Sequence, residues 1–587
     1  MINFKENEQL NMLNHSCAHV LAQAVKRLFP NAKFWVGPVI DTGFYYDIDL
    51  QDYSIKEEDL EKIESQMKKI SKEAKYITRI ELTKAQALEL FSEDNYKLDL
   101  INNLPENEII SAYKQGEFID LCRGPHVSST KEIKYFKLIK FSGAYYKGDS
   151  SLQVLQRIYG VCFPTEEELN EYLQNLEEAK LRDHRKIGKD LNLFMTHELV
   201  GSGFPLFLPA GANIRNKLER YIKDKEEKLG YLHVYTPSIA TVNLYKTSGH
   251  WDHYKDNMFP VMKMDNEELV LRPMNCPHHM LIYKNSLHSY RDLPLRIGEL
   301  AHDFRYEASG AVAGIERVRQ MCQNDAHLFV RPDQIKEEFK NVVKLILEVY
   351  KDFNIKDYEF RLSLRDELDK EKYFPDDTMW NNAESELREV LNEIKSEFNI
   401  NYFEAKGEAA FYGPKLDVQV KTAIGHELTV STCQLDFLLP QRFDLTYVDQ
   451  FNTKVRPVVL HRAILGSFER FMAFIIEEYK GAFPLWLSPN QISIVPVHTS
   501  SHLKYALKVK EKLTALNLSV NLDDRNEKFN YRLRDSQITK TPITLVIGDA
   551  EVASKTLNIR EYGSLETKIM PLNEFLKYVK KRIDEKR

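Results

Sequence analysis

The amino-acid sequence predicts a multidomain protein that combines α+β with α/β architecture. A chain of 587 residues exceeds the size at which one hydrophobic core stops growing, so we expect about three to five domains. Residues 190–487 mix helical and β-rich stretches without regular alternation, which favours an antiparallel sheet surrounded by helices. Residues 491–587 do alternate strand and helix patterns, and they therefore predict a small α/β domain.

Composition excludes several classes of protein. Hydrophobic residues make up 43% and charged residues 29% of the chain, which is typical of folded rather than disordered proteins. The longest apolar runs, at 204–212 and 492–497, fall short of the roughly 20 residues that a membrane helix needs. Residues 1–14 lack the apolar core of a signal peptide, so we expect a cytoplasmic protein without a membrane partner. The net charge of −6 gives no overall attraction to nucleic acid, so any RNA binding must come from local basic patches.

The N-terminal region begins with a helix predicted over 14–29, which ends before Pro30. A strand is predicted over 43–47. A second helix is predicted over 54–75, with Ser54 as its N-cap and Glu57 as the partner in a capping box. Its buried face follows from the helical spacing of four apolar residues, Leu60, Ile63, Met67 and Ile70.

A long charged helix is predicted over 163–189, opened by a capping box of Thr165 and Glu168. Its last turns are strongly basic, which suits a helix C-terminus and equally suits a solvated surface. We expect this helix to connect two domains.

The central region contains three segments that suit nucleotide chemistry or a buried interface. A strand-like run from 297 ends at Arg305 and Glu307, and a planar guanidinium there can bind phosphate oxygens. At 459–470 a strand gives way to a helix carrying Arg470, and Gly466 leaves room for a nucleotide. The third segment is a helix over 213–229, followed by a strand that ends near Pro237. Each arginine taken alone is more often a surface charge or a structural ion pair.

The strands predicted in the C-terminal domain cover 492–497, 518–522 and 543–547, and its helices cover 503–515, 529–537 and 571–583. The β-rich stretches predicted in the central region cover 411–421 and 427–437.

The three central segments resemble motifs 1, 2 and 3 of the class II aminoacyl-tRNA synthetases. The threonyl-tRNA synthetase family is matched more closely, by Met274-Asn-Cys-Pro277, Gln323-Asn-Asp-Ala-His-Leu-Phe329, Ala410-Phe-Tyr-Gly-Pro-Lys415, Gln434-Leu-Asp-Phe437 and His461-Arg-Ala-Ile-Leu-Gly-Ser467. The resemblance implies an α+β editing domain at 1–163, a helical linker at 164–190, a class II antiparallel-sheet catalytic domain at 191–487 and an α/β anticodon-binding domain at 488–587. The family often begins with a further ubiquitin-like domain of about 60 residues, which this chain is expected to lack, because His15 comes almost at once.

The implied activity is ATP-dependent ligation of L-threonine to tRNA(Thr) through a threonyl-adenylate. By the resemblance, Arg305 holds the α-phosphate of ATP, Glu307 the adenine and Arg470 the γ-phosphate, with Mg²⁺ bridging the phosphates. Motif 1 implies a homodimer. The resemblance also assigns a set of residues to the threonine and ATP pocket: Met274, Arg317, Gln323, Asp325, Tyr412, Lys415 and Gln434.

Six scattered cysteines show no disulfide framework spacing and are candidate metal ligands. The resemblance implies one Zn²⁺ per subunit, bound by Cys276, His327 and His461. These residues lie far apart in the sequence, so their spacing alone could not have revealed a metal site. Three protein ligands leave coordination open, so zinc could accept the amino and hydroxyl groups of threonine, which valine cannot offer. His278 stands where the family usually has glycine, and Cys322 is a second departure. If either closed the open position, the zinc would be structural.

A second Cys/His cluster is predicted near the N-terminus. His15 and His19 share one face of a helix, and Cys122 and His126 supply a thiol and a third imidazole. The composition suits either a metal site or a hydrolytic pocket. Both segments resemble the editing domain of threonyl and alanyl synthetases, which implies hydrolysis of mischarged seryl-tRNA(Thr), with Asp120 as an accessory residue. Metal occupancy stays open.

Candidate anticodon contacts in the C-terminal domain are Arg525, Asn526, Lys528, Glu551 and Arg560, for which a solvated charged face is the alternative. Three rival functions account for the sequence less well. A noncatalytic RNA-binding relative would lose the phosphate-binding arginines, yet Arg305 and Arg470 are present. A zinc hydrolase would leave about 400 residues unused, and seryl or prolyl specificity does not account for the Cys276, His327 and His461 set.

Overall fold

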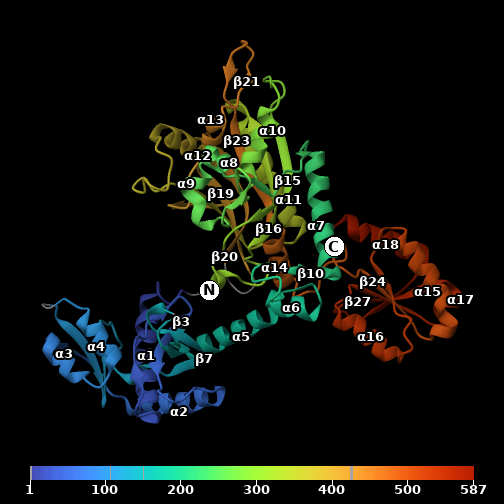
Figure 1. The fold of residues 1–587 in the computed structure, drawn as a ribbon. Helices are drawn as coiled ribbons and strands as arrows, with labels where there is room; N and C mark the ends of the chain where they lie inside the picture. The colour runs from blue at the N-terminus through green and yellow to red at the C-terminus, as the bar shows by residue number, and fades with distance from the viewer. Residues whose placement is uncertain (1–2, 106–107, 150, 399, 423–426) are drawn as a thin grey trace. The chain divides into compact units, whose positions relative to one another are not determined.

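A computed structural model describes residues 3–105, 108–149, 151–398, 400–422 and 427–587 (Figure 1). The chain divides into two compact units, Met1–Glu178 and Ala179–Arg587. The three domain boundaries drawn from the sequence stay predictions. None of the described helices is long and apolar enough to cross a membrane.

In the first unit, helix α1 (Glu8–Leu28) packs against the five-stranded sheet that contains β3 and β8. The strands of this sheet are β1 (Lys33–Phe34), β2 (Val39–Ile40), β3 (Gly43–Asp49), β7 (Tyr135–Tyr145) and β8 (Val154–Phe163). The predicted start of the first helix at residue 14 was wrong. Asn7 caps the helix by accepting the Leu10 N–H at 3.0 Å, and Leu10 is buried, so two more turns are stable.

Helix α2 (Glu57–Glu73) has the predicted buried face, since Ile63, Met67 and Ile70 are buried. The predicted cap at Ser54 was wrong. The Asp59 carboxylate accepts the Lys56 N–H at 3.0 Å, so the helix begins at Glu57, three residues later than expected. The first unit is completed by α3 (Lys84–Leu90), α4 (Asn95–Asn102) and the small sheet of β4 (Ile77–Leu82), β5 (Ile110–Gln115) and β6 (Phe118–Leu121).

The predicted helix over 163–189 is two helices, α5 (Glu166–Arg182) and α6 (His184–Asp190). The capping box at its start is confirmed, with Thr165 N–H to Glu168 Oε2 at 3.1 Å and Glu168 N–H to Thr165 Oγ1 at 3.2 Å. The break lies at Asp183, where the backbone leaves the helical region at ψ 116° and the carboxylate accepts the Arg185 N–H at 2.8 Å. A capping side chain inside the charged run therefore ends one helix and starts the next.

The second unit contains the predicted antiparallel sheet, in the strand order β11-β15-β16-β23-β20-β19-β17-β18. Only the edge pairs β11/β15 and β17/β18 are parallel. The strands are β11 (Leu232–His233), β15 (Leu295–Phe304), β16 (Gln320–Val330), β17 (Tyr358–Leu364), β18 (Tyr402–Lys406), β19 (Lys415–Lys421), β20 (Glu427–Asp436) and β23 (Val458–Ser467). The predicted strand start at 411 was wrong, because Pro414 cannot donate to a ladder.

Helices α7 (Pro209–Lys228), α11 (Ile335–Asp352) and α14 (Phe468–Glu478) surround this sheet and share its core. Helix α7 begins four residues before the predicted position, because Pro209 is well suited to a first helical turn. The strand-to-helix change predicted at 459–470 is confirmed by β23 and α14.

The C-terminal domain has the strand order β25-β24-β26-β27-β28. The predicted elements appear as β24 (Ile492–Pro496), α15 (Thr499–Thr514), β25 (Val520–Leu522), α16 (Phe529–Ile538), β26 (Ile543–Ile547) and α18 (Leu572–Asp584). Helix α17 (Asp549–Ser554) and the strands β27 (Thr556–Glu561) and β28 (Thr567–Pro571) were missed. The last two pair antiparallel at the sheet edge, outside the strand-helix alternation used for prediction.

Candidate functional sites

The structure brings Cys276, His327 and His461 together, with one ligand atom of each within 4.8 Å of the others. Cys276 opens α10 (Cys276–Lys284), while His327 on β16 lies directly opposite His461 on β23. All three side chains are buried. Strand register therefore supplies two ligand positions and a helix start supplies the third.

Hydrogen bonds orient both imidazoles of this group. His461 Nε2 lies 2.8 Å from Asp436 Oδ2, which leaves Nδ1 for the group. His327 Nδ1 lies 2.8 Å from His279 Nδ1, and its Nε2 is buried without a hydrogen-bond partner among the described residues. A buried unpartnered nitrogen is costly unless something else binds it. Two imidazoles and a thiol with such a nitrogen fit a zinc ion.

Cys322 and His278, the two residues that depart from the family pattern, do not belong to this group. Cys322 packs in the core beneath the sheet, and its backbone N–H donates to Glu469 Oε2 at 2.8 Å. His278 lies on α10, but its ring is not among the grouped ligand atoms. Three protein ligands remain, which leaves coordination open.

His250 is a neighbour of this group that the sequence interpretation missed. It opens α9 (His250–Tyr254), and its Nε2 lies 3.5 Å from Cys276 Sγ. Ser248 Oγ lies 2.8 Å from its Nδ1, and burial lowers its pKa to about 3, so the ring is neutral at pH 7. Local sequence spacing carries no signal for it, because Cys276 is 26 positions away.

A cavity of about 140 Å³ joins the predicted nucleotide residues. Its lining includes Arg305, Glu307, Glu316, Arg317, Gln323, Gly466, Ser467 and Arg470. Burial lowers the pKa of Arg470, and the nearby charge of Arg305 lowers it further. Arg305 Nε is buried and has no hydrogen-bond partner among the described residues. Two guanidinium groups sharing one cavity make an anion site.

Gly466 also has a role in the backbone, besides the one predicted. Its φ is +62°, and a Cβ at this position would lie 2.6 Å from the Val430 carbonyl oxygen. The backbone therefore requires glycine, besides any space that it leaves for a ligand. The following Ser467 caps α14 by accepting the Arg470 N–H at 3.3 Å, which places this arginine in the first helical turn.

The residues predicted to line the threonine and ATP pocket lie in different surroundings. Tyr412 stacks on His461 with ring centroids 5.0 Å apart, and its hydroxyl donates to Gln434 Oε1 at 2.6 Å. Asp325 lies two positions before His327 and so on the same face of β16. Lys415 pairs with Asp417 at 2.9 Å, and Met274 packs beside the Cys276 core. The Arg317 guanidinium pairs with Glu307 at 3.0 Å.

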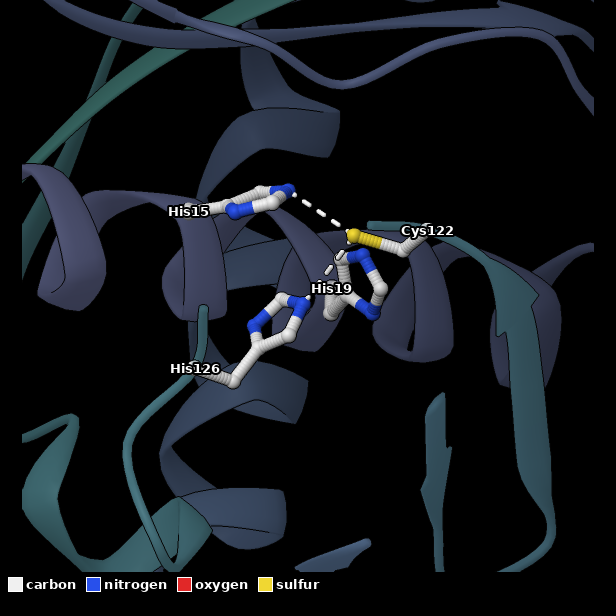
Figure 2. A group of neighbouring side chains, drawn as sticks. All are labelled: His15, His19, Cys122 and His126. Atoms are coloured by element: carbon white, nitrogen blue, oxygen red, sulfur yellow. Dashed lines mark hydrogen bonds between the residues drawn. The ribbon is translucent and has the colours of Figure 1, made fainter. Parts of the chain in front are cut away.

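The N-terminal cluster also assembles, as Figure 2 shows for His15, His19, Cys122 and His126. Cys122 Sγ lies 3.1 Å from His15 Nε2 and 3.2 Å from His126 Nε2. The ring of His126 lies 4.3 Å from those of both other histidines, measured between centroids. The α1 helix presents two of these residues, and the chain after β6 presents the others.

Burial keeps this cluster uncharged. It lowers the pKa of His19 to about 4 and also lowers the pKa of His15 and of His126. Burial raises the pKa of the Cys122 thiol to about 12. At pH 7 the imidazoles can therefore accept protons from water, whereas the thiol is a poor nucleophile.

Asp120 anchors one end of the cluster through two residues that the sequence interpretation missed. Lys97 Nζ lies 2.5 Å from Asp120 Oδ1, and the Tyr46 hydroxyl donates to Asp120 Oδ2. His19 Nε2 lies 3.6 Å from the same carboxylate. Burial disfavours charge on Asp120, but Lys97 and His19 outweigh it and lower its pKa. Lys97 is itself buried, which is rare for lysine.

The predicted anticodon contacts do not form one cluster of free side chains. Arg525 pairs with Asp523 and Asp535, both at 2.6 Å. Glu551 caps α17 by accepting the Gly548 N–H at 2.9 Å. Asn526 and Lys528 are exposed, and Arg560 lines a surface pocket on β27.

Several known proteins and family models are similar to this chain. Family models match at 259–479 (tRNA synthetase class II core domain), 491–582 (anticodon binding domain) and 110–159 (threonyl and alanyl tRNA synthetase second additional domain). A threonine–tRNA ligase of Geobacillus sp. (strain WCH70) is 58% identical over 98% of this chain and 89% of its own. The threonine–tRNA ligase of Oceanobacillus iheyensis is 56% identical over 100% of this chain and 90% of its own. A solved structure of the RNA-binding domain of the Cryptosporidium parvum threonyl-tRNA synthetase is 33% identical, with a TM-score of 0.65 over 68% of this chain and 98% of its own.

Proposed function

Because the chain belongs to the threonine–tRNA ligase family, we propose that its three assembled sites activate threonine, select it and remove errors. The activity is ATP-dependent ligation of threonine to tRNA(Thr), with editing of seryl-tRNA(Thr). The observation that carries the proposal is the assembly of Cys276, His327 and His461 beside the arginine-lined cavity. Measuring ATP–pyrophosphate exchange with each amino acid tests it, and exchange should depend on threonine.

The cavity residues act on ATP. We propose that Arg305 binds the α-phosphate and Arg470 the γ-phosphate of ATP, with Glu307 at the adenine. Mg²⁺ would enter with ATP, and its charge would help to neutralise the phosphates. The threonine carboxylate attacks the α-phosphorus and pyrophosphate leaves. Charge that develops on phosphorus is then met by preorganised guanidinium groups, and little acid-base chemistry is needed.

Amino-acid selection is assigned to the Cys276, His327 and His461 group. These residues would hold one zinc ion per subunit, whose open coordination can accept the amino and hydroxyl groups of threonine. Asp325 lies on the same strand face and can accept a proton from either group. Tyr412 and Gln434 form the neighbouring wall through their mutual hydrogen bond.

Editing is assigned to the cluster around His15 and His19. The neutral imidazoles can orient a water molecule and take its proton as it attacks the seryl ester carbonyl. The products are serine and the free 3′ end of the tRNA. Asp120, held by Lys97, keeps His19 oriented. We propose direct attack by water, because the protonated Cys122 thiol is poorly suited to form a covalent intermediate.

Changing both His15 and His19 to alanine should leave threonine activation intact and make seryl-tRNA(Thr) a stable product. Serine offers the same amino and hydroxyl groups as threonine and lacks only one methyl group. That methyl is worth about 1–3 kcal/mol, or about 10- to 200-fold, against the roughly 10,000-fold that translation needs. A second site must therefore remove serine, and a small pocket can admit the seryl ester alone.

The measurement is deacylation of preformed seryl-tRNA(Thr) by wild-type and double-mutant protein. Threonine-dependent pyrophosphate exchange by the same preparations controls for folding of the other unit. Equal deacylation by both proteins would show that this cluster is not the editing site.

We also propose that the chain forms a homodimer through α7 and the segment up to Pro237, as motif 1 implies. In the described structure Leu229, Leu232 and Tyr235 are exposed along this segment, with Tyr235 at 85%. Apolar side chains exposed in a row are typical of a surface that another subunit covers. Sedimentation at micromolar concentration should give a dimer, and replacing Leu232 and Tyr235 with aspartate should give a monomer. A wild-type monomer would contradict this interface.

The anticodon contacts and the cytoplasmic location stay predictions. Arg560 is the best supported of the five anticodon candidates, because its pocket is open to solvent and includes the exposed Tyr562 and Leu565. Such a surface of cationic and apolar side chains can stack and bind unpaired bases.

A further inference from the structure

We propose that His279, a residue without an assigned role, is a positioning residue that fixes the tautomer of His327 so that its free nitrogen faces the metal. The inference rests on the zinc site proposed above. A buried series of hydrogen bonds joins Glu299 to His279 and His279 to His327. His279 follows Cys276 by one turn of α10, so both lie on the same helix face.

The distances connect all three side chains. Glu299 Oε2 lies 3.1 Å from His279 Nε2, and His279 Nδ1 lies 2.8 Å from His327 Nδ1. The exposed fractions of Glu299, His279 and His327 are 3%, 0% and 0%. Water therefore has no access to these bonds, and each nitrogen must find its partner within the protein.

The protons can be assigned from the partners. Burial disfavours charge on Glu299, but His279, Arg272 and the Thr236 N–H outweigh it and hold its pKa at about 2. An ionised carboxylate only accepts, so His279 Nε2 carries the proton. A metal-bound imidazole coordinates through one nitrogen and donates its other N–H to a neighbouring acceptor, and His327 Nδ1 is the nitrogen that lies 2.8 Å from His279 Nδ1, so it donates to that atom. This leaves the lone pair of His327 on Nε2.

That nitrogen is the one without a partner in the described structure. It belongs to the residue whose ligand atom lies within 4.8 Å of those of Cys276 and His461. The same rule fixes the tautomer of His461 without an intermediate residue, because Asp436 Oδ2 lies 2.8 Å from His461 Nε2. A carboxylate thus orients each imidazole, directly for His461 and through His279 for His327.

Glu299, at the end of this hydrogen-bond series away from His327, is held by further contacts. Glu299 accepts from the Thr236 N–H at 2.9 Å, from Asn275 Nδ2 at 3.2 Å and from Arg272 at 3.5 Å. These contacts hold the carboxylate in one orientation, which is transmitted to both rings. His279 cannot itself be a ligand in this arrangement, since both of its nitrogens are used.

The test measures zinc affinity by competition with a chelator, on full-length wild type and variants. His279→Met keeps the volume of the side chain and removes both hydrogen bonds, so zinc should bind about 10- to 100-fold more weakly. In His279→Gln an amide oxygen and amide NH₂ can replace the two ring nitrogens, and most of the affinity should return. His278→Met is the matched control on the same helix and should bind zinc as the wild type does.

Circular dichroism and thermal unfolding of the variants check that each is folded. Wild-type affinity in folded His279→Met would overturn the inference, and so would an equal loss in His278→Met, which would point to general damage of α10. Folded His279→Gln that fails to bind zinc would also overturn it. Absence of zinc from the wild type would instead contradict the proposed metal site.

Discussion

Changing Cys276 to serine is expected to remove the bound zinc and the threonine-dependent pyrophosphate exchange together. Serine is not ionised at neutral pH and lacks the soft sulfur that zinc prefers, so only two imidazoles would remain. Two ligands cannot hold the ion against dilution. Metal analysis should fall from about one zinc per chain to a trace, and exchange should fall to background.

Cys322→Ser is the matched control for this experiment. Cys322 is also a buried cysteine and lies on β16, the strand that carries His327, but its side chain is outside the ligand group. The control should keep both zinc and exchange. Full threonine-dependent exchange by a metal-free preparation would contradict the selection mechanism.

Changing Arg305 to alanine should lower adenylate formation by about 100- to 1000-fold, the usual cost of losing one transition-state contact. Arg305 has no salt bridge in the described structure, and its Nε has no partner, so its charge is available to a ligand. The guanidinium would act on the charge that develops at phosphorus. Affinity for tRNA should change little, because the guanidinium acts on the phosphate of ATP.

The measurement is ATP–pyrophosphate exchange beside a filter-binding assay for tRNA(Thr). Arg291→Ala is a control, since Arg291 is exposed and, among the described residues, its guanidinium bonds only to the adjacent Tyr290. A variant at Arg305 that lost tRNA affinity and kept normal exchange would contradict the assignment.

Local elements were predictable where short-range patterns decide them. The buried face of α2 follows from helical spacing, and the Thr165 and Glu168 capping box follows from a three-residue motif. Predictions failed at caps whose partner could not be chosen from sequence. At α2 the cap uses Asp59 rather than Ser54, and Asp183 divides one predicted helix into two.

The sequence by itself determined the family, through motifs of adjacent residues, and it determined that His15 and His19 share a helix face. The tertiary structure alone decided which distant residues meet. His327 and His461 are neighbours because β16 and β23 pair in one register, while Lys97, His250 and His279 had no local signal. Ligation and hydrogen bonding depend on distances through space, and between residues far apart in the chain these are set by strand register and helix packing.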